Sequence, residues 1–156
     1  MAILNAGISD SRTPLSTENV REHLETNVLG ACAWIEAVLP WLRAAGSGVI
    51  AGVSSPAAFR GWPGLAPYSA SKAALSKVLE SLRVDLRGTG VDVVTVYPGF
   101  VKSGITARRD AKDMPGLMET DAGARAMLRG IAKRRREVQL PWLLPAFLRF
   151  WLGALP

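Results

Sequence analysis

The sequence predicts an α/β fold in which helices pack on a parallel sheet. Three apolar stretches have the length of buried strands, namely residues 1–4, 48–53 and 91–97. Between them lie two segments, 17–44 and 68–87, in which apolar residues recur at helical spacing. Strands that alternate with helices indicate parallel pairing. A length of 156 residues with 49% hydrophobic content allows one globular domain with a buried core.

The first strand and the first helix have residues suited to their ends. The strand over residues 1–4 would end at the turn Asn5-Ala6-Gly7, where the glycine allows close approach of the backbone. Ser16 or Thr17 can cap the helix that follows. Its apolar residues form one stripe, made of Val20, Leu24, Val28, Ala31, Ile35, Val38 and Leu39. His23 falls outside this stripe, so we expect it on the surface.

The rest of the chain alternates in the same way. The elements that we expect are, in order, a strand over residues 48–53, a helix from Tyr68 to about Arg87, a strand over 91–97, a helix from Thr120 through Ile131 and a strand over 137–140. Residues 104–119 carry mixed charge and Pro115-Gly116, which is typical of a loop that forms a substrate-specific flap.

Composition and charge argue against several classes of protein. The net charge of +6 comes largely from Lys133-Arg134-Arg135-Arg136 and Arg108-Arg109, which we interpret as solvated faces. No aromatic residues alternate with these basic ones, so we expect no nucleic-acid partner. The single cysteine, Cys32, provides neither a disulfide framework nor a zinc site, and we expect no bound metal. Without a secretory signal at residues 1–4, we expect a cytoplasmic location.

Tyr68 and Lys72 are four residues apart at the start of the second long helix. Positions i and i+4 lie on the same face of a helix, so the Lys72 ammonium can approach the Tyr68 oxygen. A nearby cation favours the ionised form of a phenol and lowers its pKa from about 10 toward neutrality. The pair can therefore exchange a proton with a substrate. By itself, the same spacing also fits an ordinary pair on a helix surface.

Further polar residues lie at the expected carboxyl ends of the strands, where ligands bind in open α/β sheets. Ser55 follows strand 48–53 and precedes Tyr68 by thirteen residues. A hydroxyl there can donate to a substrate carbonyl as negative charge grows on its oxygen. Pro98-Gly99 follows strand 91–97 in the same way.

With Thr26-Asn27-Val28-Leu29-Gly30, these motifs resemble those of the short-chain dehydrogenase/reductase family. The resemblance implies a Rossmann-like doubly wound sheet and an oxidoreductase that interconverts an alcohol and a carbonyl with NAD or NADP. It implies that Tyr68 is the general acid/base and that Lys72 lowers its pKa and contacts the nicotinamide ribose. It further implies that Ser55 orients the carbonyl, and that Asn27 kinks its helix and supports a proton relay.

The resemblance also assigns a cofactor site. The residues that it implies there are Asn5, Ala6, Gly7, Tyr68, Lys72, Pro98, Gly99, Val101 and Ser103. Of these, the backbone of Val101 and the hydroxyl of Ser103 would hold the nicotinamide carboxamide, with serine in place of the family's threonine. The family also implies a small-molecule substrate and a homo-oligomer. The choice between NAD and NADP stays open.

The resemblance covers only the second half of a family member. A dinucleotide-binding unit has a glycine-rich turn after its first strand, where backbone amides and a helix end hold the pyrophosphate. Here Gly46-Ser47-Gly48 and Gly88-Thr89-Gly90 precede strands instead. We therefore expect a partial sheet that lacks its first βαβ units, from either a start codon placed too late or a true fragment. The alternative function is an inactive fragment that acts as an interaction or dimerising module through its two long helices.

The chain divides into a catalytic part, residues 1–140, and an apolar tail, residues 141–156. The tail is interrupted by Pro141, Pro145 and Arg149 and is shorter than the about 20 apolar residues that a membrane-spanning helix needs. It would form a lid over the substrate pocket, an oligomer contact or a peripheral segment on a membrane surface.

Overall fold

Strands of the described residues form one parallel sheet. The computed structural model describes residues 1–9, 15–107, 110, 112 and 114–140. The strands are β1 (Ala2–Leu4), β2 (Gly48–Val53), β3 (Val91–Pro98) and β4 (Glu137–Leu140), and they lie side by side in chain order. The predicted parallel sheet is therefore confirmed, and β1 is an edge strand of its described part.

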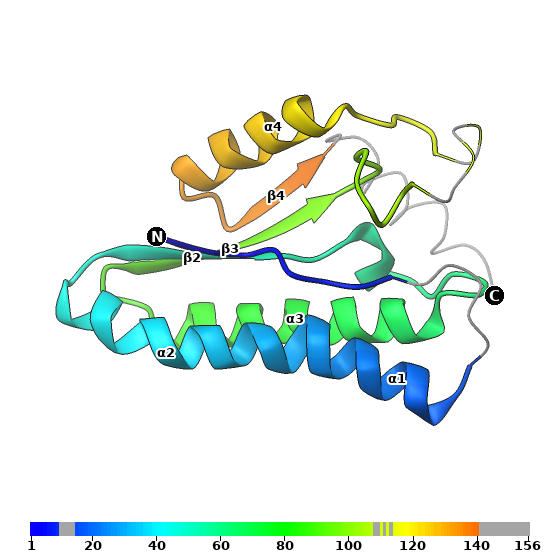
Figure 1. Ribbon diagram of the computed structural model, residues 1–156. Coiled ribbons are helices and arrows are strands. Elements are labelled where there is room, and N and C mark those ends of the chain that lie inside the picture. Colours follow the sequence, from blue (N-terminus) through cyan, green and yellow to red (C-terminus); the bar gives the residue numbers. More distant parts are fainter. Residues whose placement is uncertain (10–14, 108–109, 111, 113, 141–156) are drawn as a thin grey trace.

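Helices cover both faces of this sheet (Figure 1). The helices α1 (Thr17–Leu24), α2 (Gly30–Ala44) and α3 (Ala66–Asp85) lie on one face, and α4 (Thr120–Ala132) packs on β3 and β4 from the other. The first helix begins where the sequence predicts, because the Ser16 side chain accepts a hydrogen bond from the Asn19 amide at 3.1 Å. This arrangement confirms the doubly wound α/β class.

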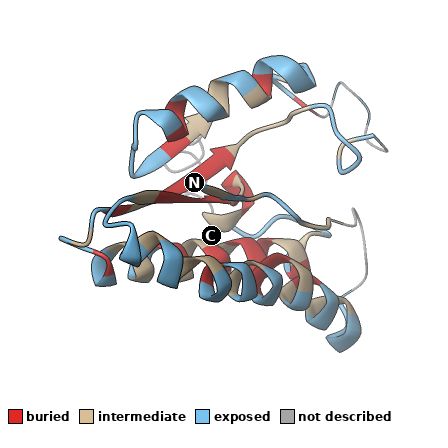
Figure 2. Ribbon diagram, turned by 60° about the vertical axis from the view of Figure 1, so that its left-hand side comes forward, coloured by how far each residue is buried: buried red, intermediate tan, exposed pale blue. Residues whose placement is uncertain are grey.

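Each face of the sheet has its own apolar core. Successive side chains of a strand point to opposite faces, so the apolar runs of β2 and β3 supply both cores. The core under α3 contains Ile50, Leu75, Leu79, Val91 and Val93, and the core under α4 contains Val49, Ala51, Val94, Val96, Ile131 and Val138. Figure 2 shows the buried residues along the sheet and on the helix surfaces that face it.

The first long helical segment contains one widened turn. Glu25–Leu29 form a π-helical turn (η1) between α1 and α2, in which the Gly30 amide donates to the Glu25 carbonyl five residues earlier. Asn27 lies in this turn and is 1% exposed. A π-helical turn is one of the recognised causes of a helix kink. This turn lies at Asn27, the residue at which the family resemblance implies a kink.

The expectation that His23 lies on the surface is wrong. The side chain is 1% exposed, and its Nδ1 donates to the Asn19 carbonyl at 2.7 Å. The reason is that α1 packs against α3. The buried face of α1 is therefore wider than its apolar stripe. It includes His23, which helical periodicity places outside that stripe.

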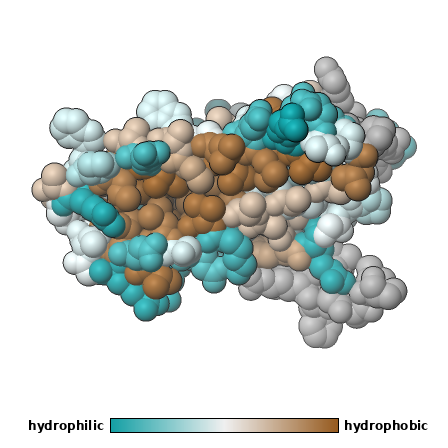
Figure 3. All heavy atoms as spheres, turned by 90° about the horizontal axis from the view of Figure 1, so that it is seen from below, coloured by the Kyte–Doolittle hydropathy of each residue, from teal (hydrophilic) through white to brown (hydrophobic). Residues whose placement is uncertain are grey.

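The outer surface of the helical layer carries exposed apolar side chains. Figure 3 shows hydrophobic residues gathered on the face of the molecule that is seen from the helix side. On α2, Trp34 and Trp41 are 65% and 79% exposed and lie two turns apart on the same side. We find no membrane-spanning helix among the described residues. The tail over 141–156 lies outside the described residues, and so do the expectations for it.

Candidate active site

The predicted catalytic residues lie at the carboxyl edge of the sheet. After β2 the chain passes through Ser55 into a short 3₁₀ helix, η2 (Pro56–Ala58), and α3 then runs back along the sheet (Figure 1). Tyr68 and Lys72 therefore fall in the first turns of α3, next to the end of β2. This is the edge at which open α/β sheets bind ligands.

Lys72 is a buried cation at this edge. Its side chain is 3% exposed, and its Nζ donates to the Val53 carbonyl at 2.9 Å. Burial lowers the pKa of Lys72 from its ordinary value of 10.5 to about 8, because desolvation disfavours the charged form. The group is still mostly charged at neutral pH. Its Nζ lies 5.8 Å from the centre of the Tyr68 ring, within the range of a cation–π interaction.

Asn27 is held by hydrogen bonds on both ends of its side-chain amide. Oδ1 accepts from the Ile8 amide at 2.8 Å, and Nδ2 donates to the Ile8 carbonyl at 3.0 Å and to Ser71 Oγ at 2.9 Å. Ser71 Oγ in turn donates to the Tyr68 carbonyl at 2.8 Å. The amide therefore joins the segment that follows β1 to the first turns of α3.

Gly7 makes room for both of these side chains. A Cβ placed on Gly7 would lie 3.1 Å from Asn27 Oδ1 and 3.2 Å from Lys72 Nζ. A side chain there would push against the amide and the ammonium together. The structure thus brings Gly7, Asn27 and Lys72 into contact, while Asn5 and Ala6 of the same predicted motif are exposed.

Ser55 caps the 3₁₀ helix that follows β2. Its Oγ accepts a hydrogen bond from the Ala57 amide at 3.2 Å, and the side chain is partly accessible. Because the oxygen is used as an acceptor, the hydroxyl hydrogen is the part that can meet an incoming carbonyl oxygen. Ser55 comes two residues after Val53, whose carbonyl holds Lys72.

The predicted residues after β3 lie at the same edge but belong to another set of contacts. Pro98 ends β3, and the Gly99 amide donates to the Leu140 carbonyl at 2.6 Å. Val101 forms a bridge with Met118, and a Cβ on Gly123 of α4 would meet the Val101 methyl groups. Ser103 is exposed. These residues position the segment that leads toward α4.

Sequence reasoning missed the serines that support Lys72 and Asn27. The Lys72 carbonyl accepts from Ser54 Oγ at 3.0 Å and from Ser76 Oγ at 2.8 Å. The bond from Ser76 could have been found, because a helical serine commonly bonds the carbonyl four residues earlier. The bond from Asn27 to Ser71 joins residues 44 positions apart, and no local pattern indicates it.

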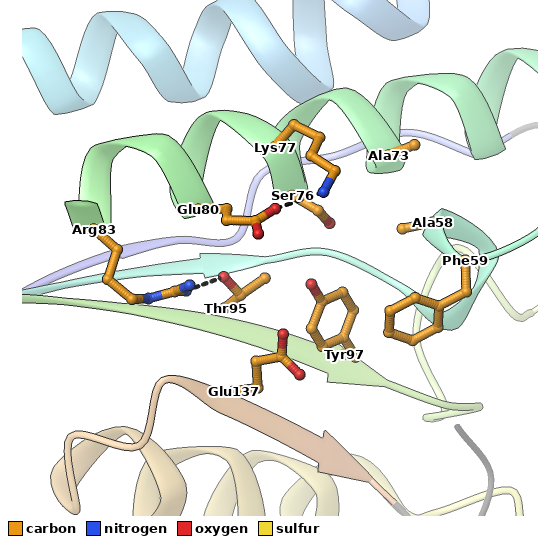
Figure 4. A pocket seen from close by; sticks show the side chains of 10 residues that line it. All are labelled: Ala58, Phe59, Ala73, Ser76, Lys77, Glu80, Arg83, Thr95, Tyr97 and Glu137. Carbon is orange, nitrogen blue, oxygen red and sulfur yellow. Dashed lines mark hydrogen bonds and ion pairs between the residues drawn. The ribbon is translucent and has the colours of Figure 1, made fainter. Parts of the chain in front are cut away.

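A separate cavity of about 210 Å³ lies between α3, β3 and the start of β4 (Figure 4). The charged groups along α3 are engaged there: Lys77 pairs with Glu80 at 2.6 Å, and Arg83 donates to Thr95 Oγ1 at 2.7 Å. Tyr97 packs against Phe59 with ring centres 4.7 Å apart and ring planes tilted by 35°. The cavity contains none of the predicted site residues. Among the described residues, no three His, Cys, Asp or Glu side chains are grouped to hold a metal ion.

Comparison with known proteins adds to this geometry. The model of the short chain dehydrogenase family matches residues 1–114. An uncharacterized oxidoreductase of Myxococcus xanthus (strain DK1622) is 49% identical over 146 residues, which cover 92% of this chain and 57% of that protein.

Two solved structures share the fold. A short-chain dehydrogenase from Burkholderia cenocepacia J2315 in complex with NADP has a TM-score of 0.86 and 26% identity, over 98% of this chain and 65% of that one. A short-chain dehydrogenase from Sphingobium yanoikuyae in complex with NADPH has a TM-score of 0.82 and 26% identity, over 97% and 61%. The chain spans less than two thirds of each of these relatives.

Proposed function

The chain belongs to the short-chain dehydrogenase family, and we propose that it carries the catalytic residues of an oxidoreductase that interconverts an alcohol and a carbonyl with NAD or NADP. The observation that carries this proposal is the buried Lys72 ammonium, which the Val53 carbonyl holds against the ring of Tyr68. The relatives solved with NADP and NADPH support the choice of cofactor class.

The donors at this edge fit a nicotinamide nucleotide. Lys72 gives one N–H to the Val53 carbonyl and has further N–H groups for a ribose hydroxyl. Gly7 keeps the backbone beside Lys72 free of a side chain, and the exposed Ser103 hydroxyl suits a carboxamide. When bound, the nicotinamide supplies or accepts the hydride.

The chain's own residues handle the proton. Tyr68 gives its phenolic proton to the substrate oxygen in reduction and takes it back in oxidation. The Lys72 cation favours the phenolate form of Tyr68. Ser55 donates its hydroxyl hydrogen to the same substrate oxygen as charge grows there. Asn27, fixed between Ile8 and Ser71, supports the path by which the proton is replaced.

The test is turnover of NADH and NADPH with a panel of small ketones and aldehydes. Tyr68→Phe removes one hydroxyl and little volume, so we expect it to abolish turnover and leave the fold intact. Ser55→Ala should lower the rate by about 10²–10³, as the loss of one oxyanion donor does. Tyr97→Phe is the matched control, because it makes the same change in the separate cavity. Near-wild-type turnover by Tyr68→Phe refutes the assignment.

The assay is run on the 156 residues and on the longest open reading frame that contains them. The 156 residues have no glycine-rich turn to hold a pyrophosphate. We therefore expect them to bind NADH and NADPH weakly by themselves, as measured by calorimetry. Micromolar binding of either nucleotide by residues 1–156 would contradict this expectation.

A second candidate function is an interaction module. The exposed Trp34 and Trp41 favour it, because large apolar side chains left open to solvent on one side of a helix suit a protein contact. A homo-oligomer that packs through this helical layer is compatible with both functions. Sedimentation of the protein and of Trp41→Lys measures the contact. A protein that self-associates through this face yet shows neither nucleotide binding nor turnover would favour the module over the enzyme.

A further inference from the structure

We propose that Ser71 is a positioning residue, which fixes the Asn27 amide and joins it to the main chain of Tyr68. Its consequence for catalysis rests on the function proposed above. The positioning itself rests on geometry alone. Ser71 is fully buried and Asn27 is 1% exposed, so their polar groups have no access to water as a substitute partner.

The hydrogen bonds from Asn27 to Ser71 and from Ser71 to Tyr68 both donate in the same direction. Asn27 Nδ2 carries two hydrogens, and it donates one to the Ile8 carbonyl and the other to Ser71 Oγ. Ser71 therefore acts as an acceptor toward Asn27, and its own hydrogen goes to the Tyr68 carbonyl at 2.8 Å. The result is a one-way chain from the π-helical turn, through Ser71, to the residue that we propose as general acid/base.

The same bonds leave the amide only one good orientation. Ile8 presents an N–H to Oδ1 and a carbonyl to Nδ2, and Ser71 presents an acceptor on the Nδ2 side. A flipped amide would turn like groups toward one another at Ile8. Ser71 adds the partner that anchors this amide to α3, because Ile8 lies in the segment after β1.

A shift of the Asn27 side-chain amide would change the contacts of Lys72. Asn27 Oδ1 and Lys72 Nζ both border Gly7, at 3.1 and 3.2 Å from the position of a Cβ there. Ser71 is also the chain neighbour of Lys72. A loosened Asn27 would therefore change the surroundings of the buried ammonium on which the proposed chemistry depends.

The simpler explanation is a helical serine that only bonds the carbonyl one turn back, as many do. Ser71 makes that bond, but it also accepts from Asn27, 44 residues away. Ser69 provides the comparison on the same helix. It is buried as well, yet its Oγ has no hydrogen-bond partner among the described residues. Ser69→Ala is thus the matched control for Ser71→Ala.

The experiment follows the Ile8 amide by NMR hydrogen exchange. That amide bonds to the Asn27 side chain, so its protection reports directly on the position of Asn27. We expect Ser71→Ala to speed its exchange about tenfold, the order of effect of one lost hydrogen bond. Ser69→Ala should leave the rate unchanged, and Ser71→Thr, which keeps the hydroxyl, should restore protection. Equal Ile8 exchange in Ser71→Ala and wild type overturns the proposal.

If Ser71→Ala fails to fold, the wild-type protein still provides a test of the proposal. In the wild-type protein, both Nδ2 hydrogens of Asn27 should exchange slowly, because both are bonded. An Nδ2 hydrogen that exchanges as fast as in a free amide overturns the proposal without any variant.

The catalytic consequence has its own measurement. Ser71 touches no substrate, so in an active protein Ser71→Ala should lower kcat and leave KM for the carbonyl nearly unchanged. An unchanged kcat with faster Ile8 exchange would overturn the catalytic part. The exchange measurements need neither nucleotide nor turnover, so a failure of the proposed function is seen separately from a failure of the positioning.

Discussion

Replacing Lys72 with methionine should stabilise the protein at neutral pH, because burial of the Lys72 ammonium is costly. Lowering the pKa of Lys72 from 10.5 to about 8 corresponds to about 3 kcal/mol against folding while the group is charged. Methionine fills a similar volume without the charge. The substitution also removes the hydrogen bond to the Val53 carbonyl, which contributes about 1.5 kcal/mol because its donor is charged. We therefore expect Lys72→Met to be more stable by about 1.5 kcal/mol at pH 7.

The pH dependence of the free energy of unfolding tests whether desolvation of Lys72 causes the gain in stability of Lys72→Met. Below pH 8 both the folded and the unfolded protein hold the Lys72 proton, and the whole cost is present. Between pH 8 and about 10.5 the folded protein releases the proton while the unfolded chain keeps it, so wild-type stability rises with pH. The advantage of Lys72→Met should shrink through this window and then reverse, because only the lost hydrogen bond remains.

Urea denaturation followed by tryptophan fluorescence at pH 7, 8.5 and 10 measures this. Other lysines and tyrosines titrate in the same range, so the quantity to compare is the difference between variant and wild type. Lys77→Met is the matched control, because Lys77 is exposed and pairs with Glu80 at the helix surface. It should change stability little at any of these pH values. If Lys72→Met is less stable than wild type at pH 7, by an amount that stays constant to pH 10, the desolvation argument is wrong.

The glycine and asparagine beside Lys72 give two further predictions. Gly7→Ala should destabilise the protein by about 1–3 kcal/mol in urea denaturation, because its Cβ would press on Asn27 and Lys72. Gly61→Ala, whose Cβ would meet no atom within 4 Å, is its control, and equal effects of the two would contradict the prediction. Asn27→Leu leaves the Ile8 amide and carbonyl without partners and should cost about 2–4 kcal/mol in the same assay. A cost below about 0.5 kcal/mol would show that water replaces the amide.

The sequence by itself determined the elements of the fold, because their signals are local. The apolar runs at 48–53 and 91–97 are too short for helices and became β2 and β3. Ser16 marks a helix start through its own side chain, which accepts from the Asn19 amide, and α4 begins at Thr120 as predicted. The i, i+4 spacing of Tyr68 and Lys72 likewise places both on one face of α3, whatever surrounds the helix.

Only the tertiary structure decided which residues those elements bury and which partners their polar groups bond. Periodicity indicates that one face of a helix is covered, but it does not say by what. The packing of α1 against α3 therefore buries His23 against expectation. The π-helical turn at Asn27 and its bond to Ser71 depend on two segments that are distant in the chain. The lowered pKa of Lys72 has the same origin, because a sequence lists charges while desolvation depends on the atoms that the fold packs around them.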